Sequence, residues 1–334
     1  MANRIAAFGE VMMRLQVPGY DLLSQASSLN YSFSGTGVNV TSALSRFGHT
    51  GMLISRLPDN AVGDAAAANL RKLGIETTFV ERGGQYVGMY FLENGFGARP
   101  SRVTYSNRQE SSFNTAPDGT YAYDEIAGQI DMLHGCGITL AMNDNVRAHL
   151  IRLASAVKKR GGIVAFDCNY RPGHWGEGGY AKARPYYEQM LMLADIVMMN
   201  ERDAMYVLGM QTDKETREEQ LAALIPEVAR RFGITVIAGT HRNVNADNTH
   251  SLRGFHYKNE TLTSSELNTF AVYDRIGAGD AYASGIIHAE LEGFAPDKAV
   301  RFAVSAAMLA HTIAGDTPLS SERDITRAMT ESAG

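Results

Sequence analysis

Short runs of apolar residues alternate along the chain with longer segments in which apolar residues recur at helical spacing. The short runs predict buried strands at residues 5–8, 51–57, 138–142, 163–166, 196–199 and 235–238. The longer segments predict helices at residues 37–47, 65–73, 146–159 and 221–232. Strands that alternate with helices usually form a mostly parallel sheet with helices on both faces. We therefore predict an α/β fold built on such a sheet.

Two segments, residues 15–33 and 76–105, interrupt the alternation with strand-like runs that have no convincing helix between them. We expect these segments to form a small separate β-sheet, a lid over the main domain. The main domain then comprises residues 1–14, 34–75 and 106–334. Because an isolated small sheet leaves an apolar face and open edges, we expect a homodimer in which two lids pack together.

Composition narrows the class of protein. The 334 residues suffice for a full core, and the formal net charge of −5 argues against a nucleic-acid partner. The only cysteines, Cys136 and Cys168, have no CxxC or Cys/His pairing, which indicates a reducing compartment and no structural zinc. We find no secretory signal and no apolar stretch of membrane-spanning length. We therefore expect a soluble cytoplasmic protein with no membrane partner.

The segment from residue 274 to residue 285 carries the clearest chemistry. Gly277, Ala278 and Gly279 precede Asp280, and a helix of small residues follows. Glycines let the backbone approach a ligand, and a helix start directs free N–H groups at an anion. Asp280 could accept a proton from a substrate hydroxyl, so one segment would supply both a base and an anion hole for phosphoryl transfer. Taken alone, the same residues also fit a tight turn whose aspartate caps a helix.

Four segments resemble, in the right order, the motifs of the ribokinase/PfkB family of carbohydrate kinases. They are Gly35-Thr36-Gly37-Val38-Asn39-Val40, Asp167-Cys168-Asn169-Tyr170-Arg171-Pro172, Asn200-Glu201-Arg202-Asp203 and Asp274 to Asp280. Within the family, residues 99–105, 137–139, 169–175, 274–276 and 311–316 look most like 2-keto-3-deoxygluconate kinases. Two departures are Ser34, where the family usually has a glycine, and Asp203, where glutamate is common.

The resemblance implies a ribokinase-like fold and ATP-dependent phosphorylation of 2-keto-3-deoxygluconate to its 6-phosphate. Asp280 is implied as the catalytic base, with Gly277, Ala278 and Gly279 as the anion hole. The implied sugar contacts are Gly35, Asn39, Tyr90, Tyr105, Arg108, Ile138, Arg171, Asp280 and Asp316. The implied contacts to ATP are Asn169, Asn200, Gly277 and Gly279, with Asp203 bound to Mg²⁺ through water. A monovalent cation is a further candidate cofactor.

Arg108 and Arg171 suit an acid sugar, because a guanidinium binds a carboxylate in a fork. In a protein of net negative charge, such local pairing has to supply the attraction.

Several alternatives bear on this interpretation. A nicotinamide enzyme is excluded because Val40 stands where its fingerprint needs a third glycine. The absence of a P-loop sequence argues against a P-loop kinase. A kinase for fructose or for a ketodeoxy inositol derivative stays open, as does a sugar-binding protein of the same fold without catalysis. Asn39 also fits a simple capping residue, and Asp203 a solvated helix residue.

Overall fold

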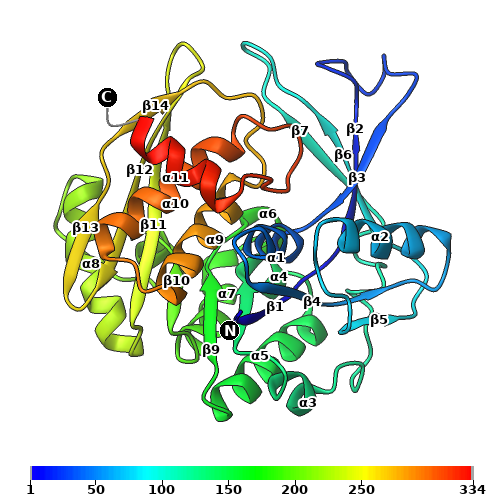
Figure 1. Ribbon diagram of the computed structural model, residues 1–334, viewed down its shortest axis with the longest axis horizontal. Helices are drawn as coiled ribbons and strands as arrows, with labels where there is room; N and C mark the ends of the chain where they lie inside the picture. The colour runs from blue at the N-terminus through cyan, green and yellow to red at the C-terminus, as the bar shows by residue number, and fades with distance from the viewer. Residues whose placement is uncertain (1, 332–334) are drawn as a thin grey trace.

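A ten-stranded β-sheet runs through the molecule (Figure 1). The computed structural model describes residues 2–331. In spatial order the strands are β13 (Thr261–Ser264), β12 (His250–Lys258), β11 (Val236–Val244), β10 (Ile196–Met198), β9 (Ile163–Asp167), β8 (Met132–Cys136), β1 (Arg4–Phe8), β4 (Thr50–Leu57) and β5 (Val80–Arg82), and β14 (Asn268–Phe270) pairs with β12. Strands β11 to β5 run parallel, whereas β12 pairs antiparallel with β11, β13 and β14.

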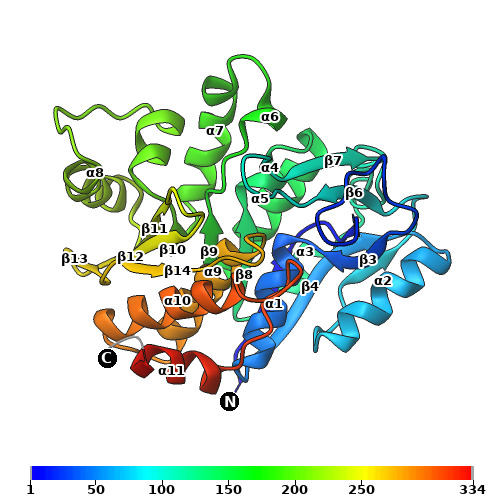
Figure 2. The same ribbon diagram turned by 90° about the horizontal axis from the view of Figure 1, so that it is seen from above.

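Helices cover both faces of this sheet, as Figure 2 shows from above. One layer contains α3 (Tyr123–Ala127), α4 (Gly137–Leu140), α5 (Asp144–Lys159), α6 (Pro172–Trp175), α7 (Gly179–Leu191), the π-helical turn η1 (Asp203–Val207) and α8 (Arg217–Phe232). The other contains α1 (Thr36–Arg46), α2 (Ala61–Lys72), α9 (Ala278–Leu291), α10 (Pro296–Ala310) and α11 (Glu322–Glu331). Strand β1 shows why the strand sequences are continuously apolar: Ile5 packs under the second layer and Phe8 under the first. The predicted ribokinase-like α/β fold is confirmed.

One predicted strand is wrong. The strand expected at residues 138–142 lies six residues earlier, as β8, and residues 137–140 form the short helix α4. His134 and Gly135 made the true strand look polar and interrupted, yet all five of its residues are buried. A short apolar run does not distinguish a buried strand from a buried helical turn, so pairing of β8 with β1 and β9 decides the outcome.

A second, four-stranded sheet stands over one end of the large sheet. We call it the lid sheet; its order is β3 (Asn30–Ser34), β2 (Met12–Gln16), β6 (Gly88–Glu93) and β7 (Arg102–Ser106). Strands β3, β6 and β7 come from the two segments expected to form the lid, whereas β2 begins at Met12 and lies mostly in residues predicted for the main domain. Residues 80–82 pair instead with β4 of the large sheet. The segment 76–105 is therefore divided, because its first strand continues the parallel sheet after α2. Residues 1 and 332–334 of the predicted main domain lie outside the described residues.

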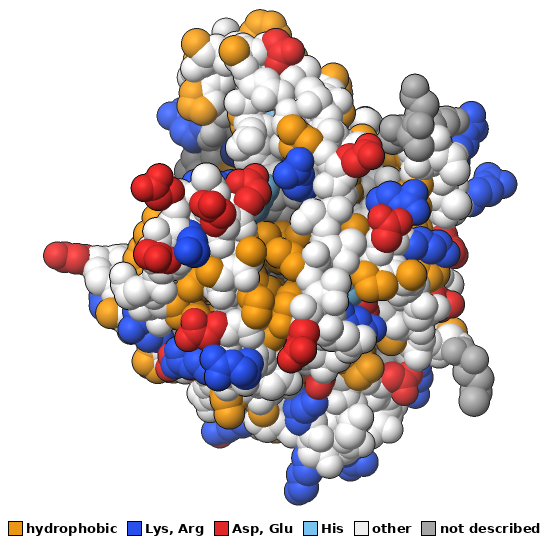
Figure 3. All heavy atoms as spheres, turned by 90° about the vertical axis from the view of Figure 1, so that its left-hand side faces the viewer, with side chains coloured by type: hydrophobic (Ala, Val, Ile, Leu, Met, Phe, Trp, Pro, Cys, Tyr) orange, Lys and Arg blue, Asp and Glu red, His pale blue; other side chains and the backbone are white. Residues whose placement is uncertain are grey.

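The surface carries charges of both signs. On the face drawn in Figure 3, at the β13 side, Lys and Arg side chains are interspersed with Asp and Glu around a hollow lined by hydrophobic side chains. No helix within residues 2–331 is long and apolar enough to cross a membrane.

Candidate active site

A cleft of about 780 Å³ opens between the carboxyl ends of the parallel strands and the lid sheet. This is where open α/β sheets bind ligands. It brings together nearly every site residue predicted from the sequence: Gly35, Asn39, Tyr90, Tyr105, Arg108, Ile138, Asn169, Arg171, Asn200, Gly277, Ala278, Gly279, Asp280 and Asp316. The remaining one, Asp203, lines an adjoining hollow of about 420 Å³ that shares Asn169, Arg171 and Asn200 with the cleft.

The start of α9 forms one wall of the cleft. Gly277 caps the helix with φ 82°, and a Cβ atom there would lie 1.7 Å from the carbonyl oxygen of Asp316. Only glycine satisfies both conditions. A Cβ atom at Gly279 would meet no other atom within 4 Å, so the backbone at Gly279 faces open space. The turn therefore exposes the first N–H groups of α9 to the cleft, as an anion site requires.

Asp280 lies in the first turn of α9 and is buried. Burial raises the pKa of its carboxyl group to about 7, and the nearby Asp316 carboxylate adds to the shift. Nδ2 of Asn39, in α1, donates a 2.7 Å hydrogen bond to Asp280, which opposes the rise in its pKa. Asn39 is thus not a helix cap; the N-cap of α1 is Gly35. A carboxylate with a pKa near neutrality is suited to act as a general base.

Two further carboxylates, Asp167 and Asp203, line the adjoining hollow. Burial raises the pKa of Asp167 to about 7, with a contribution from Asp280, and raises that of Asp203 to about 6. Asp203 accepts a 2.9 Å hydrogen bond from the backbone N–H of Asn200. The sequence analysis gave Asp167 no role, although its position at the carboxyl end of a buried strand was the signal that could have found it.

Arg171 carries a positive charge that acts on all three acids. Its charge lowers the pKa of Asp280, Asp167 and Asp203. It is exposed, and among residues 2–331 it forms no ion pair; its guanidinium donates to the carbonyl of Tyr170 at 3.3 Å. Arg171 is therefore available to a ligand.

Arg108 is held differently. Its Nε donates to Oε2 of Glu10 at 2.9 Å, and its Nη1 lies 3.2 Å from Nε2 of His174. The guanidinium also lies over the ring of Tyr105, 4.8 Å from its centroid. Burial raises the pKa of Glu10, and its bond to Arg108 opposes that rise. Sequence reasoning missed Glu10, so it did not foresee that Arg108 is already paired.

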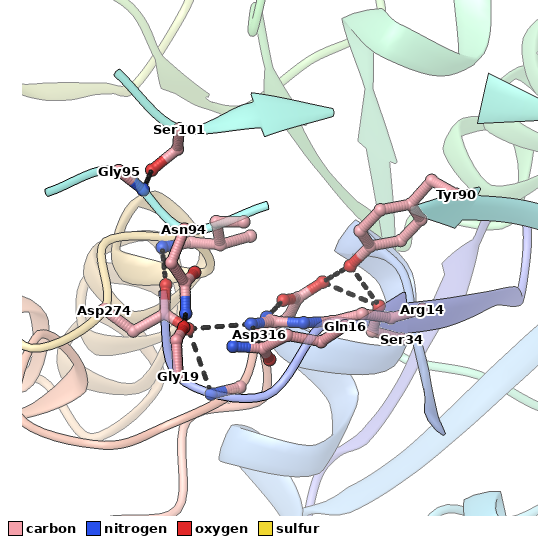
Figure 4. A network of polar contacts seen from close by, with 12 residues as sticks. Arg14, Gln16, Gly19, Ser34, Tyr90, Asn94, Gly95, Ser101, Asp274 and Asp316 are labelled. Atoms are coloured by element: carbon pink, nitrogen blue, oxygen red, sulfur yellow. Dashed lines mark hydrogen bonds and ion pairs between the residues drawn. The ribbon is translucent and has the colours of Figure 1, made fainter. Parts of the chain in front are cut away.

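Figure 4 shows how Asp316 is held in the cleft wall. Arg14 of β2 donates to Oδ1 of Asp316, while the hydroxyl groups of Ser34 and Tyr90 donate to Oδ2. Arg14 also donates to Asp274 at 2.8 Å and is only 1% exposed. Both Asp316 oxygens therefore have protein donors from the lid sheet. Arg14 was missed because nothing in its local sequence marks a buried arginine.

Another part of the cleft is basic. Arg242 and Arg275 line it with His311 and Thr240, and neither arginine pairs with an acid among residues 2–331. Burial and the charge of Arg275 lower the pKa of Arg242. Thr240 and Arg242 lie in a segment that carries none of the four family motifs, whereas Arg275 lies within the motif at 274–280 but was given no ligand contact. By contrast, Glu201 does not line the cleft and bonds Arg217 and His241.

Comparison with known proteins gives consistent results over the whole chain. The profile described as "pfkB family carbohydrate kinase" matches residues 2–323. The 2-dehydro-3-deoxygalactonokinase of Haloferax volcanii is 27% identical over 98% of this chain and 97% of its own. The crystal structure of 2-dehydro-3-deoxygluconokinase from Thermotoga maritima has a TM-score of 0.94 and 30% identity over 99% of both chains. That of a candidate 2-keto-3-deoxygluconate kinase from Enterococcus faecalis has a TM-score of 0.94 and 37% identity over 98% of this chain and 97% of its own.

Proposed function

The chain belongs to the pfkB family of carbohydrate kinases, and from this premise we propose that it phosphorylates a 2-keto-3-deoxy sugar acid with ATP. The substrate that fits best is 2-keto-3-deoxygluconate, with the 6-phosphate as product. The observation that carries the proposal is that one cleft contains both the buried base Asp280 and Arg171, whose guanidinium forms no ion pair among the described residues.

Asp280 accepts the proton of the sugar hydroxyl as the hydroxyl oxygen attacks the γ-phosphorus of ATP. The bond between that phosphorus and the bridging oxygen of ADP breaks, and the new phosphate ester forms. The N–H groups at the start of α9, over residues 277–280, offset the negative charge on the transferred group. Asn39 keeps the Asp280 carboxylate oriented and lowers its pKa.

The acids around the adjoining hollow fit Mg²⁺. Asp167 and Asp203 are both costly to ionise, the charge of Asp203 adds to the cost at Asp167, and a divalent cation would relieve it. Carboxylate and amide oxygens are also the ligands this ion prefers, and Asn169 and Asn200 line the same hollow. When bound, Mg²⁺ neutralises charge on the ATP phosphates. Asp203 would contact it through water, and Asp167 is added here to the predicted set.

We place the rest of the nucleotide at the basic part of the cleft. Arg242 and Arg275 repel each other, and a polyphosphate between them would remove that repulsion. Asn169, Asn200, Gly277 and Gly279 line the same cleft, as contacts to the phosphates require.

The sugar acid would lie under the lid sheet. Its carboxylate pairs with Arg171, and Arg108 contributes the donors that Glu10 and His174 leave free. Gly35, Tyr90, Tyr105, Ile138 and Asp316 complete the sugar side of the cleft. Gly35 must stay small because a Cβ there would meet the carbonyl oxygen of Glu10 at 2.2 Å.

Three further proposals concern the whole protein. We propose a homodimer through the lid sheets and a cytoplasmic location, the latter because both cysteines are free thiols. Dependence on a monovalent cation stays a prediction, to be tested by titrating K⁺ into the assay.

Steady-state kinetics test the substrate. The wild type should turn over 2-keto-3-deoxygluconate in preference to fructose, with ADP formation as the readout. Since a charge-assisted hydrogen bond contributes about 1.5–3 kcal/mol, Arg171→Ala should raise KM for the acid sugar by about ten- to a hundredfold and leave KM for ATP unchanged. Arg71→Ala, an exposed arginine in α2, is the matched control.

Arg108→Ala should also raise KM for the acid sugar, but it leaves buried Glu10 without its cationic partner. Its kinetics should therefore be interpreted together with its melting temperature. A preference for fructose with a silent Arg171→Ala would overturn the acid-sugar proposal. No ADP formation with any sugar would favour a binding protein.

A further inference from the structure

A second cluster of ligand-type side chains lies at the end of α9 remote from the cleft. His49 follows α1, His288 and Glu292 belong to the last turn and end of α9, and Glu322 begins α11. His288 comes eight residues after Asp280 on the same helix, a distance of about 12 Å along the axis. Figure 2 shows α1 and α11 on the same side of the large sheet.

The donor atoms converge. Nε2 of His49 lies 2.9 Å from Nδ1 of His288, and a carboxylate oxygen of Glu292 is within 4.8 Å of a ring nitrogen of each histidine. Two nitrogens each bound at ~2.05 Å to a tetrahedral ion lie ~3.3 Å apart. A small outward movement of the two rings would thus admit an ion, and the exposed Glu292 carboxylate leaves a route from solvent.

A carboxylate and three aromatic rings surround His288. Its other ring nitrogen, Nε2, is buried without a hydrogen-bond partner among the described residues and lies 3.7 Å from the half-exposed Glu322 carboxylate. A small shift of Glu322 would hold the proton on Nε2 and direct the Nδ1 lone pair, which now faces His49, at an ion. The rings of Phe47, Phe294 and Phe302 pack around His288 with centroids 5.1–5.6 Å away and hold its orientation.

Charge also favours a cation here. Glu292 and Glu322 contribute two negative charges near the imidazoles, whereas Lys298 contributes one positive charge. The cluster therefore offers a cation two imidazole donors in surroundings of net negative charge.

We propose that His49, His288 and Glu292 form a zinc site that joins α9 to the turn after α1. Two imidazoles and one carboxylate are a ligand set that zinc favours and that magnesium does not, which separates this site from the ATP-linked magnesium. The cysteine pattern gave no indication of zinc because these ligands are histidine and glutamate, up to 243 positions apart in the sequence.

The test uses the full-length protein freed of metal by a chelator. Zn²⁺ titrated against a chromophoric chelator should bind at one equivalent and raise the melting temperature, and Co²⁺ should give the visible absorption of a four-coordinate site. Glu292→Gln, which changes an exposed side chain, and His49→Gln should each weaken Zn²⁺ binding at least tenfold. Glu227→Gln, a glutamate in α8 on the other face of the sheet, should bind like the wild type.

Absence of stoichiometric binding would overturn the proposal and leave a simple imidazole pair. Equal Zn²⁺ affinity in the wild type, Glu292→Gln and His49→Gln would also overturn it, because the ion would then lie elsewhere. Displacement of the bound Zn²⁺ by millimolar Mg²⁺ would contradict the distinction from the ATP site. None of these outcomes depends on which sugar is phosphorylated.

Discussion

At the scale of single residues, the cleft depends on carboxyl groups whose pKa values lie close to neutral pH. Asp280 and Asp167 have their pKa raised to about 7 and Asp203 to about 6, chiefly by burial. Asn39 and Arg171 act in the opposite direction on Asp280. The base is therefore poised near physiological pH, where loss of its proton is easily reversed.

The pH dependence of the reaction should reflect the raised pKa of Asp280. Because the ionised form of Asp280 accepts the proton, kcat/KM should rise with pH through about 7. Asn39→Ala removes a hydrogen bond that lowers the pKa, so it should move this limb to higher pH. Asp280→Asn should reduce kcat by about 10²–10⁴-fold. Retention of more than a tenth of the wild-type kcat would contradict the role of Asp280.

Stability measurements distinguish the loss of kcat in Asp280→Asn from misfolding of that variant. A raised pKa means that folded Asp280 holds its proton more tightly than in the unfolded chain. The resulting stabilisation is present below about pH 4 and is lost as pH rises through 7. Asp280→Asn should therefore unfold at a higher temperature than the wild type at pH 8, with the difference shrinking at pH 5.

At the scale of elements, two connections place the site: the turn into α9 and the attachment of the lid sheet. The first depends on a left-handed glycine pressed against the carbonyl of Asp316. The second depends on Arg14 of β2. Its guanidinium pairs with Asp274 and Asp316, which lie in loops of the main domain. Each connection fixes a wall of the cleft.

The two glycines before Asp280 should respond differently to the same change. Gly277→Ala introduces a Cβ 1.7 Å from a backbone oxygen at φ 82°, and the left-handed conformation alone costs about 1–2 kcal/mol. It should lower the melting temperature and kcat. Gly279→Ala meets no atom within 4 Å and lies inside the helix, so the fold should keep its stability. Equal melting temperatures for the two variants would contradict the assignment.

Arg14 should be costly to remove. Arg14→Met leaves the buried carboxylates of Asp274 and Asp316 without their cation, which typically destabilises a protein by about 3–5 kcal/mol. Arg152→Met is the control, because its ion pair with Asp118 is exposed, and solvent screens such a pair so that its loss should have little effect on stability. Urea unfolding measures both. If the two variants lose similar stability, the lid sheet is not held by this network.

At the scale of the whole molecule, the lid sheet presents one face to the cleft and one away from it. Ser34 and Tyr90 point to Asp316 on the cleft side. Strand alternation therefore directs Tyr31 and Phe33 to the opposite side, where Tyr31 is 64% exposed. An exposed aromatic on a sheet with open edges is consistent with a partner at this surface.

Light scattering should detect a dimer at micromolar concentration. Tyr31→Asp should shift the protein toward the monomer, because it places a charge in the proposed interface. Met192→Asp, at a 65% exposed position after α7, should leave the dimer intact. A wild-type monomer at this concentration would rule out assembly through the lid sheet.

Most of the fold could be predicted because its strands and helices follow from the local spacing of apolar residues along the chain. The strands β1, β4 and β9 and the helices α1, α5 and α8 lie within a few residues of their predicted bounds. Strand β8 was misplaced because its polar His134 hides a fully buried strand. That side chain is tolerated there because burial lowers its pKa to about 4 and keeps it neutral.

The sequence by itself determined the alternation of strands and helices, the glycine turn before Asp280 and the family resemblance, since each depends on residues close together in the chain. Only the tertiary structure decided which side chains meet: Asn39 with Asp280 across 241 positions, Arg14 with Asp316 across 302, and His49 with His288 across 239. It also left Arg171 free of an acid partner among the described residues and gave Arg108 one in Glu10. The physical reason is that burial, charge pairing and pKa depend on neighbours in space, and hydrophobic periodicity along the chain contains no information about them.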